Sequence, residues 1–214
     1  MGMGDERLIV FDLGGVVVRI CRSWGEGVRA AGLDERPILD EESDKQRRRK
    51  LSYEYQCGRM TCDDYFVAIA DGLGGAYSPA EVERVHDAWI LGEYPEIASL
   101  VRGLLDGGRA LGVLSNTSHS HWGSLVTMPA IEPIVERRHA SHLLGLCKPD
   151  PAIYRAFEHE AGWPGERIVF FDDLPENVEA AKAAGWDAVR IDHEGHTAEQ
   201  IRGALSDRGL GAAR

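Results

Sequence analysis

Four short segments of this sequence place polar side chains after, or close to, apolar runs. Carboxylates can act as nucleophiles or bind a hard cation, whereas lysine and hydroxyl donors bind anionic oxygens. Each residue alone has an ordinary explanation as a turn residue, a helix cap or a surface charge. Together they point to ligand chemistry if the fold brings them to one place. The candidate residues are Asp12, Ser115, Asn116, Lys148, Asp172 and Asp173.

A parallel sheet would bring these residues together. Strands are predicted at 8–11, 110–114, 168–171 and 188–191, with a weaker one near 134–135. Each run is nearly continuous in apolar residues, as strands buried on both faces of a parallel sheet are. The carboxyl ends of such strands meet in one crevice, where α/β proteins bind ligands.

Amphipathic segments between these strands predict helices. One begins at Pro95 and ends at the glycines 107–108, and a second has Asp150 as its cap and ends before Gly162. A third ends at Gly185. Alternation of strands and helices predicts an α/β fold with a doubly wound, Rossmann-like parallel sheet.

The segment 18–91 interrupts the alternation. It contains no convincing strand, and its patterns predict helices before Gly32 and over 43–56, 62–72 and 79–91. A crossover between parallel strands needs only about a dozen residues, so a segment of this length indicates an insertion. We therefore predict a core domain of residues 1–17 plus 92–214 and a small all-helical cap domain of residues 18–91.

Composition limits the partners. The 214-residue chain has a net charge of −11, whereas nucleic-acid-binding domains are usually basic, so we expect no nucleic-acid partner. No apolar stretch approaches a membrane span, and the acidic start differs from a signal peptide, so we expect a cytoplasmic protein with no membrane partner. The four cysteines lack CxxC spacing, which favours reduced thiols. We expect a monomer or a homodimer.

The polar segments resemble the haloacid dehalogenase superfamily, whose members are mostly phosphatases. The resemblance is carried, in the family order, by "FDLGG", "LSNTS", "CKPD" and "FFDD", and it covers essentially the whole chain. Within the predicted cap, "YQCGRMTCDDYF" is similar to a hairpin of this family's caps. The group with "FDLG", "LSNT" and "FFDD", which includes glucose-1-phosphate phosphatases, is the branch we favour.

The resemblance implies a role for each candidate residue. Asp12 would attack phosphorus and form an aspartyl-phosphate. A Mg²⁺ cofactor would neutralise both Asp12 and the substrate, with Asp12 and Asp173 as direct ligands and Asp172 bound directly or through water. Ser115 and Lys148 would bind the phosphoryl oxygens, and Asn116 would add a donor. The implied substrate is a small phosphorylated metabolite, such as a sugar phosphate.

Gly14 departs from the family pattern. The family usually has a second aspartate there, which protonates the leaving alcohol and later activates water, and glycine can do neither. Its backbone carbonyl can still complete the metal shell, which is the family's use of that position. Positioned acid–base catalysis is typically worth about 10²–10⁴-fold, so the change would weaken a phosphatase without removing its covalent chemistry.

Two alternatives to an active phosphatase follow. Hydrolysis could have lapsed, which would leave a protein that binds a phosphorylated ligand or a partner. The chain could instead be a 2-haloacid dehalogenase, which uses the same aspartate without a metal. The pair Asp172 and Asp173 argues against dehalogenation, because three acids together would repel one another without a cation.

Overall fold

The centre of the molecule is a five-stranded parallel sheet. The structure, a computed structural model, describes residues 6–134 and 137–211. The strands lie in the order β5-β4-β1-β6-β7, with β1 in the middle. All four residues of β1 are buried, as its apolar sequence predicts for a central strand. The strands are β1 (Leu8–Phe11), β4 (Ala110–Ser115), β5 (Arg138–Ala140), β6 (Ile168–Asp172) and β7 (Asp187–Arg190).

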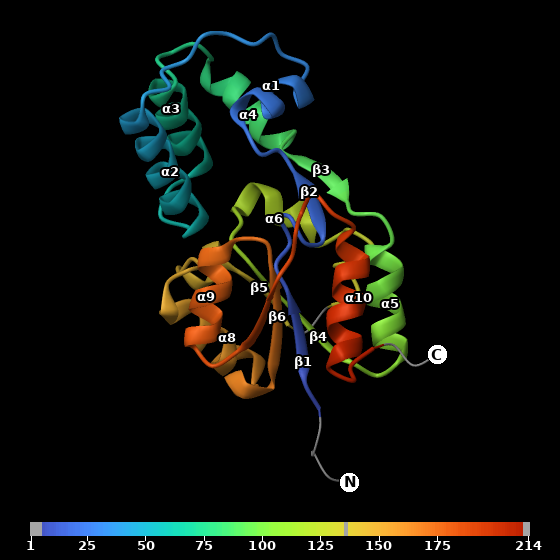
Figure 1. The fold of residues 1–214 in the computed structure, drawn as a ribbon. Coiled ribbons are helices and arrows are strands. Elements are labelled where there is room, and N and C mark those ends of the chain that lie inside the picture. Colours follow the sequence, from blue (N-terminus) through green and yellow to red (C-terminus); the bar gives the residue numbers. More distant parts are fainter. Residues whose placement is uncertain (1–5, 135–136, 212–214) are drawn as a thin grey trace.

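Helices cover both faces of this sheet. Figure 1 shows α5 (Ile97–Asp106) and α10 (Thr197–Asp207) on one face, and α8 (Pro151–Ala161) and α9 (Pro175–Ala183) on the other. Each pair of helices closes a separate apolar cluster against the sheet. Two short helices, α6 (His119–Leu125) and α7 (Ser141–Leu144), and the 3-10 turn Gly165–Arg167 complete the core. The predicted doubly wound α/β fold is confirmed.

Local signals set most of the helix ends in the core. The Asp150 side chain accepts a hydrogen bond from the Ala152 amide, and Gly162 ends α8 in a left-handed conformation with φ of 71°. Helix α5 begins at Ile97, two residues after the predicted start, because Glu96 has φ of 63° and cannot lie in a right-handed helix. The weak strand predicted near 134–135 is wrong in position. Ile134 is buried outside any strand, residue 135 lies outside the described residues, and the strand is β5.

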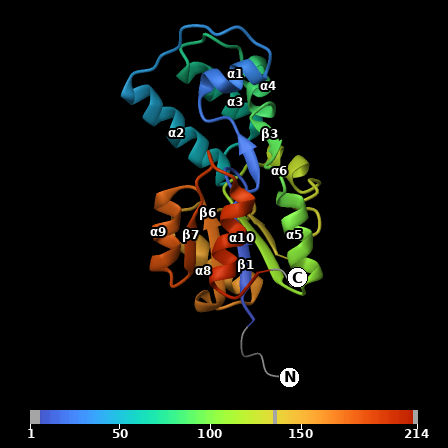
Figure 2. The ribbon, with the colours of Figure 1, turned by 45° about the vertical axis from the view of Figure 1, so that its right-hand side comes forward.

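The inserted segment forms a third apolar cluster, separate from the two against the sheet. Its helices are α1 (Trp24–Ala30), α2 (Glu42–Gln56), α3 (Cys62–Gly72) and α4 (Pro79–Asp87). They pack around the buried side chains of Val28, Phe66, Leu73 and Val85. Figures 1 and 2 show these helices beyond the carboxyl ends of the sheet strands. The insertion therefore faces the edge at which the candidate residues lie.

The prediction of an all-helical insertion is wrong at the two ends of the inserted segment, which form strands. Strands β2 (Val18–Ile20) and β3 (Ile90–Glu93) pair antiparallel where the segment leaves the core and returns to it. The helix predicted over 79–91 ends at Asp87, and the predicted boundary after residue 91 falls inside β3. Strands of three and four residues, paired across about 70 positions, are too short to produce a recognisable local pattern.

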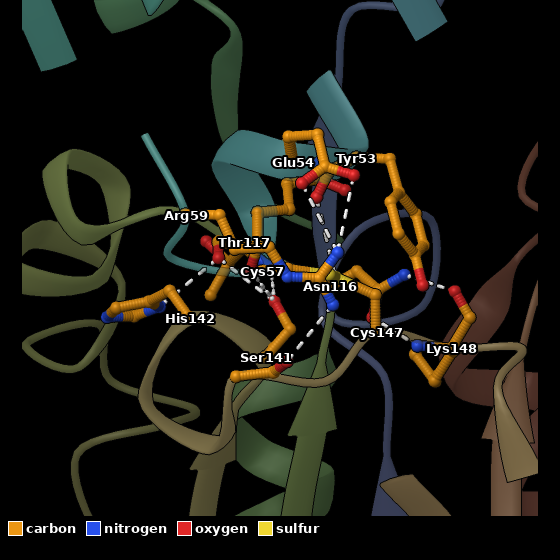
Figure 3. Close-up of a disulfide and its surroundings, with 12 residues drawn as sticks. Tyr53, Glu54, Cys57, Arg59, Asn116, Thr117, Ser141, His142, Cys147 and Lys148 are labelled. Carbon is orange, nitrogen blue, oxygen red and sulfur yellow. Dashed lines mark hydrogen bonds and ion pairs between the residues drawn. A yellow bond between two sulfur atoms is a disulfide. The ribbon is translucent and has the colours of Figure 1, made fainter. Parts of the chain in front are cut away.

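A disulfide connects the insertion to the core. Cys57, at the end of α2, is bonded to Cys147, which directly precedes Lys148 (Figure 3). The expectation of four reduced thiols is therefore wrong for this pair. The two residues are 90 positions apart, and only the contact between insertion and core brings them together. Cys21 and Cys62 are free thiols.

None of the helices in the described ranges has the length and apolar character needed to cross a membrane.

Candidate active site

The register of the sheet places the candidate residues side by side. Phe11 of β1 pairs with Phe171 of β6, so Asp12 and Asp172 follow at neighbouring positions. The Asp12 amide donates to the Phe171 carbonyl at 2.8 Å, which extends the ladder by one bond. Ser115 is the last residue of β4, on the other side of β1. Parallel pairing therefore gathers residues that are more than 100 positions apart in the chain.

Lys148 is the buried centre of this cluster. Its Nζ lies 2.6 Å from Asp172 Oδ2 and 3.0 Å from Asp12 Oδ1, and it donates to the Leu114 carbonyl at 3.0 Å. Burial opposes the charged form, but the charges of Asp12 and Asp172 outweigh it and hold the pKa of Lys148 above its usual value. The two carboxylates therefore favour the charged form of Lys148 beside Asp12.

Asp172 is fully engaged by donors of the protein. Asn177 Nδ2 donates to both of its carboxylate oxygens at 3.0 Å, and the Leu174 amide donates to Oδ1 at 2.9 Å. With Lys148 on Oδ2, both oxygens have partners. Asp172 thus orients Lys148 and leaves Asp12 and Asp173 as the more open carboxylates. The sequence analysis did not single out Asn177, although it lies in the first turn of α9, directly after the strand that ends in Asp172.

Asp12 has the features of a reactive carboxylate. Its Oδ1 is buried and accepts no well-directed hydrogen bond from the described residues, although Lys148 lies close by. Burial raises the pKa of Asp12 to about 7; Lys148 opposes this shift, and Asp172 and Asp173 add to it. A cation at the site would favour the charged, nucleophilic form.

Three carboxylates could provide ligands for such a cation. Asp12, Asp172 and Asp173 each offer an oxygen, and these oxygens lie within 4.8 Å of one another. Oxygen donors grouped in this way suit Mg²⁺. Asp12 Oδ1 is paired by charge with Lys148 but accepts no hydrogen bond from the described residues, so it keeps a lone pair that could bind a divalent ion.

Arg22 is a charged neighbour of this cluster that the sequence analysis missed. Its Nη1 donates to Asp173 Oδ2 at 2.8 Å, and His193 Nδ1 lies 3.7 Å from the same oxygen. Burial raises the pKa of Asp173, and the charge of Arg22 opposes that shift. With all three carboxylates ionised, the two cations Lys148 and Arg22 leave one net negative charge. Arg22 lies between β2 and α1, in a segment whose sequence carries no motif.

The two glycines after Asp12 differ in what surrounds them. A Cβ added at Gly14 would lie 3.0 Å from Cδ1 of Ile20, so an apolar side chain fills the space beside this residue. Gly15 has φ of 81°, and a Cβ there would lie 2.4 Å from both Arg22 Nη2 and Asp173 Oδ2. Gly15 is therefore required by the backbone and by the ion pair, whereas Gly14 is not in a left-handed conformation.

Asn116 contacts the backbone of Lys148 with its whole side-chain amide. Its Nδ2 donates to the Lys148 carbonyl, and its Oδ1 accepts from the Lys148 amide, both at 2.8 Å. Asn116 therefore positions Lys148. Ser115 is buried, and it lines a cavity of about 780 Å³ with Gly14 and Asn116. The other walls of the cavity come largely from the inserted segment.

Comparison with known proteins establishes the family. The sequence profile of the haloacid dehalogenase-like hydrolase family matches residues 6–185, which is most of the chain. The chain belongs to the haloacid dehalogenase-like hydrolases. The predicted family is confirmed, and the protein is a hydrolase of this family. The glucose-1-phosphate phosphatase branch stays a prediction.

Relatives of this hydrolase include both phosphatases and dehalogenases. It is 32% identical over 162 residues to Phosphatase MT3486 of Mycobacterium tuberculosis (strain CDC 1551 / Oshkosh), covering 70% of this chain and 75% of the relative. It is 27% identical over 154 residues to an (S)-2-haloacid dehalogenase of Pseudomonas putida, covering 72% of this chain and 68% of the relative. A haloacid dehalogenase family enzyme of Bacteroides thetaiotaomicron shares its fold, with a TM-score of 0.75 and 20% identity. The match covers 93% of this chain and 99% of that enzyme. The structure of that enzyme has also been solved with magnesium and inorganic phosphate.

Proposed function

We propose that this hydrolase is a Mg²⁺-dependent phosphatase of small phosphomonoesters, with Asp12 as the nucleophile. The observation that carries the proposal is the buried Asp12 carboxylate, which lies beside Lys148 and within reach of two further carboxylates. The relative named a phosphatase and the magnesium and phosphate complex of the structural neighbour support the proposal.

The reaction would proceed in two displacements. A carboxylate oxygen of Asp12 attacks phosphorus, and the bond from phosphorus to the leaving alcohol oxygen breaks. Water then attacks the phosphorus of the aspartyl-phosphate, which releases inorganic phosphate and restores the carboxylate. Lys148 and Ser115 would stabilise the charge on the phosphoryl oxygens throughout. The position of Lys148 supports this role, since its Nζ is 3.0 Å from Asp12 Oδ1.

The metal would be held by the open carboxylates. Asp12 and Asp173 would provide side-chain oxygens, and Gly14 would provide its carbonyl. Asp172 would act through water, because the protein already engages both of its oxygens. When bound, Mg²⁺ supplies positive charge that offsets the repulsion between the nucleophile and a phosphate dianion.

Gly14 would restrict which alcohols can leave. Neither Gly14 nor Ile20, which fills the space beside it, can protonate a leaving oxygen. The proton would come from water, so poor leaving groups would react slowly. We expect aryl and anomeric phosphates to be hydrolysed faster than alkyl phosphates.

We also propose that the inserted segment acts as a cap. Hydrogen bonds join it to the core: Tyr55 to Ser120 at 2.9 Å, and His86 to Ser118 at 3.3 Å. A cap in this position excludes bulk water and limits the size of the substrate. Small phosphorylated molecules would be accepted. The predicted division into a core and a cap would hold, with β2 and β3 as the connection.

Dehalogenation is the second candidate, because two relatives are (S)-2-haloacid dehalogenases. The ion pairs also weaken the argument from repulsion, since Lys148 pairs with Asp12 and Asp172, and Arg22 pairs with Asp173. In the form with all three carboxylates ionised, which the nucleophile requires, one negative charge nevertheless remains uncompensated. A haloacid is itself an anion and would be repelled by that charge, whereas a divalent cation would reverse it. The charge count therefore favours the phosphatase.

The deciding experiment measures phosphate release from a panel of phosphomonoesters and halide release from 2-chloropropionate, each with and without Mg²⁺. We expect phosphate release that requires Mg²⁺ and is abolished in Asp12→Asn and Asp173→Asn. The exposed Asp106→Asn on α5 is the matched control and should retain full activity. Halide release without a metal would establish the dehalogenase instead. Unchanged phosphate release in Asp173→Asn would refute the metal assignment.

A further inference from the structure

The cavity beside Ser115 has walls made mainly of aromatic and aliphatic side chains. Tyr55 and Tyr65 are stacked with ring centroids 4.0 Å apart, and aliphatic residues such as Ile69 and Val82 also line the cavity. The floor of the cavity, formed by Gly14 and Ser115, belongs to the candidate active site. A phosphoryl group bound there would leave the alcohol part of the substrate among the rings. The aromatic lining residues are Trp24, Tyr53, Tyr55, Tyr65 and Trp89.

Most polar side chains on these walls already have partners in the protein. Tyr55 OH is bonded to Ser120 Oγ at 2.9 Å, and Tyr65 OH is bonded to Ser52 Oγ at 3.1 Å. His121 Nε2 donates to the His86 carbonyl at 2.8 Å. The Asn116 amide at the floor is likewise taken by Lys148. Two lining residues are exceptions, because the buried Trp24 Nε1 has no partner and the Gln56 side chain makes no hydrogen bond within the described residues. Apart from these, the walls offer a ligand chiefly the apolar surface of rings and aliphatic chains.

The charged wall residues are also paired. Asp40 is the only acidic residue among the described residues that line the cavity. Its carboxylate lies 3.1 Å from Lys45 Nζ and 3.2 Å from an Arg48 nitrogen. Arg48 also donates to the Leu39 carbonyl at 2.7 Å. No free carboxylate in the described part of the cavity is therefore available to bind a row of hydroxyl groups or an amine.

These observations discriminate between substrates. A polyol in this cavity would exchange water for walls on which most polar groups are already paired, and each hydroxyl left unpaired would weaken binding by about tenfold or more. An apolar ring would instead remove its own surface and that of the wall from water. The gain for a phenyl group that is largely enclosed is about 10- to 100-fold in affinity.

We infer that the alcohol part of the substrate carries an aromatic or similarly apolar group, which packs against the rings of the cap. The inference rests on the proposed phosphatase function and narrows its substrate class. It opposes the sugar phosphates suggested by the sequence, and these become one outcome of the test.

The first test compares phosphates that share the same kind of leaving oxygen, so that the chemistry at Gly14 is held constant. The series is 3-phenylpropyl phosphate, propyl phosphate, glycerol 1-phosphate and glucose 6-phosphate, all phosphates of primary alcohols, assayed with Mg²⁺. We expect kcat/KM for the phenylpropyl compound to exceed the others by at least about tenfold, mainly through KM. Equal or faster hydrolysis of glycerol 1-phosphate or glucose 6-phosphate would overturn the inference.

The second test does not depend on turnover. Calorimetry in Mg²⁺ would compare 3-phenylpropylphosphonate with propylphosphonate, neither of which can be hydrolysed. Tighter binding of the phenyl compound by about tenfold or more supports the inference, even if no phosphate is hydrolysed and the proposed function fails. Equal affinity of the two compounds overturns the inference, even if phosphatase activity is found.

Variants of Tyr53 then test where the phenyl group of the ligand binds. Tyr53 lies on α2 near Cys147 and Lys148 (Figure 3), and it is one of the aromatic residues that line the cavity. Tyr53→Ala should reduce the preference for the phenyl compound by at least about threefold, whereas Tyr53→Phe should keep it. Val67→Ala, an exposed change on α3 of the same cap, is the matched control. A preference unaltered in Tyr53→Ala would contradict the proposed packing.

Discussion

Restoring a carboxylate at Gly14 is the most direct test of how this site performs acid–base chemistry. Gly14 follows Asp12, the proposed nucleophile, by two residues and has no left-handed backbone angle that would exclude other residues. The obstacle is Ile20, whose Cδ1 would lie 3.0 Å from a new Cβ and must shift by a few tenths of an ångström. Gly14→Asp should therefore place its carboxyl imperfectly, and Gly14→Asp with Ile20→Val should place it better.

The size of the effect follows from two opposing terms. A positioned general acid is worth about 10²–10⁴-fold, or roughly 2.7–5.4 kcal/mol at 1.36 kcal/mol per tenfold. Crowding against Ile20 typically costs about 1–3 kcal/mol, part of which would appear as misplacement of the carboxyl. We expect a gain of about tenfold or less in Gly14→Asp. The double variant, which removes the methyl group that Gly14→Asp would meet, should gain up to about 10²-fold on alkyl phosphates.

The assay is a plot of log kcat/KM against the pKa of the leaving alcohol, at one pH and saturating Mg²⁺. The natural protein should give a steep negative slope, and the variants should give a shallower one because the poorest leaving groups gain most. Gly14→Ala and Ile20→Val are the controls, since the first adds the Cβ without the carboxyl and the second adds only the space.

Two results would refute this reasoning. A flat plot for the natural protein would mean that another group already protonates the leaving oxygen. An equal gain in Gly14→Ala would show that the effect comes from packing and not from proton transfer. Turnover that is absent in the natural protein and present only in the aspartate variants would support the lapsed-enzyme alternative.

Three further predictions concern the cap. Reduction of the disulfide Cys57–Cys147 should lower the melting temperature, because a bond across 90 positions restricts the unfolded chain and so stabilises the fold by about 4–5 kcal/mol. The control variant Cys62→Ser should show the same drop on reduction. A melting temperature that reduction does not change would contradict the prediction. Burial, with His121 stacked on it, lowers the pKa of His86 to about 3, so the unfolded chain takes up a proton below pH 6.5 that the folded chain refuses. The free energy of unfolding, measured with urea, should therefore fall as the pH is lowered from 7 to 5, and His86 should account for at most about 2 kcal/mol of that fall. His86→Gln should reduce this pH dependence, whereas the control variant His159→Gln, at an exposed histidine, should leave it unchanged. Folded phosphoproteins should be refused, and their efficient dephosphorylation would exclude a closed cap.

The sequence alone was sufficient for the parts of the molecule that depend on local pattern. Continuous apolar runs identified β1, β4 and β6, and the caps of α8 were legible in Asp150 and Gly162. Since parallel strands share one carboxyl edge, the polar residues after them had to meet. Asp12 and Asp172 are neighbours for this reason.

Tertiary structure decided what depends on contacts between distant segments. The pairing of β2 with β3, the bond from Cys57 to Cys147 and the salt bridge from Arg22 to Asp173 each join positions about 70 to 150 residues apart. Short strands, single cysteines and a lone arginine carry no periodicity, so no window of sequence distinguishes them from their neighbours.

The same division applies to the function. The type and order of the segments that hold Asp12, Lys148 and Asp173 identified the hydrolase family to which the chain belongs. The character of the cavity was not visible in the sequence. It depends on which faces of Tyr53, Trp89 and the other cap residues turn toward Ser115, and the packing of the cap helices against one another and against the core fixes those faces.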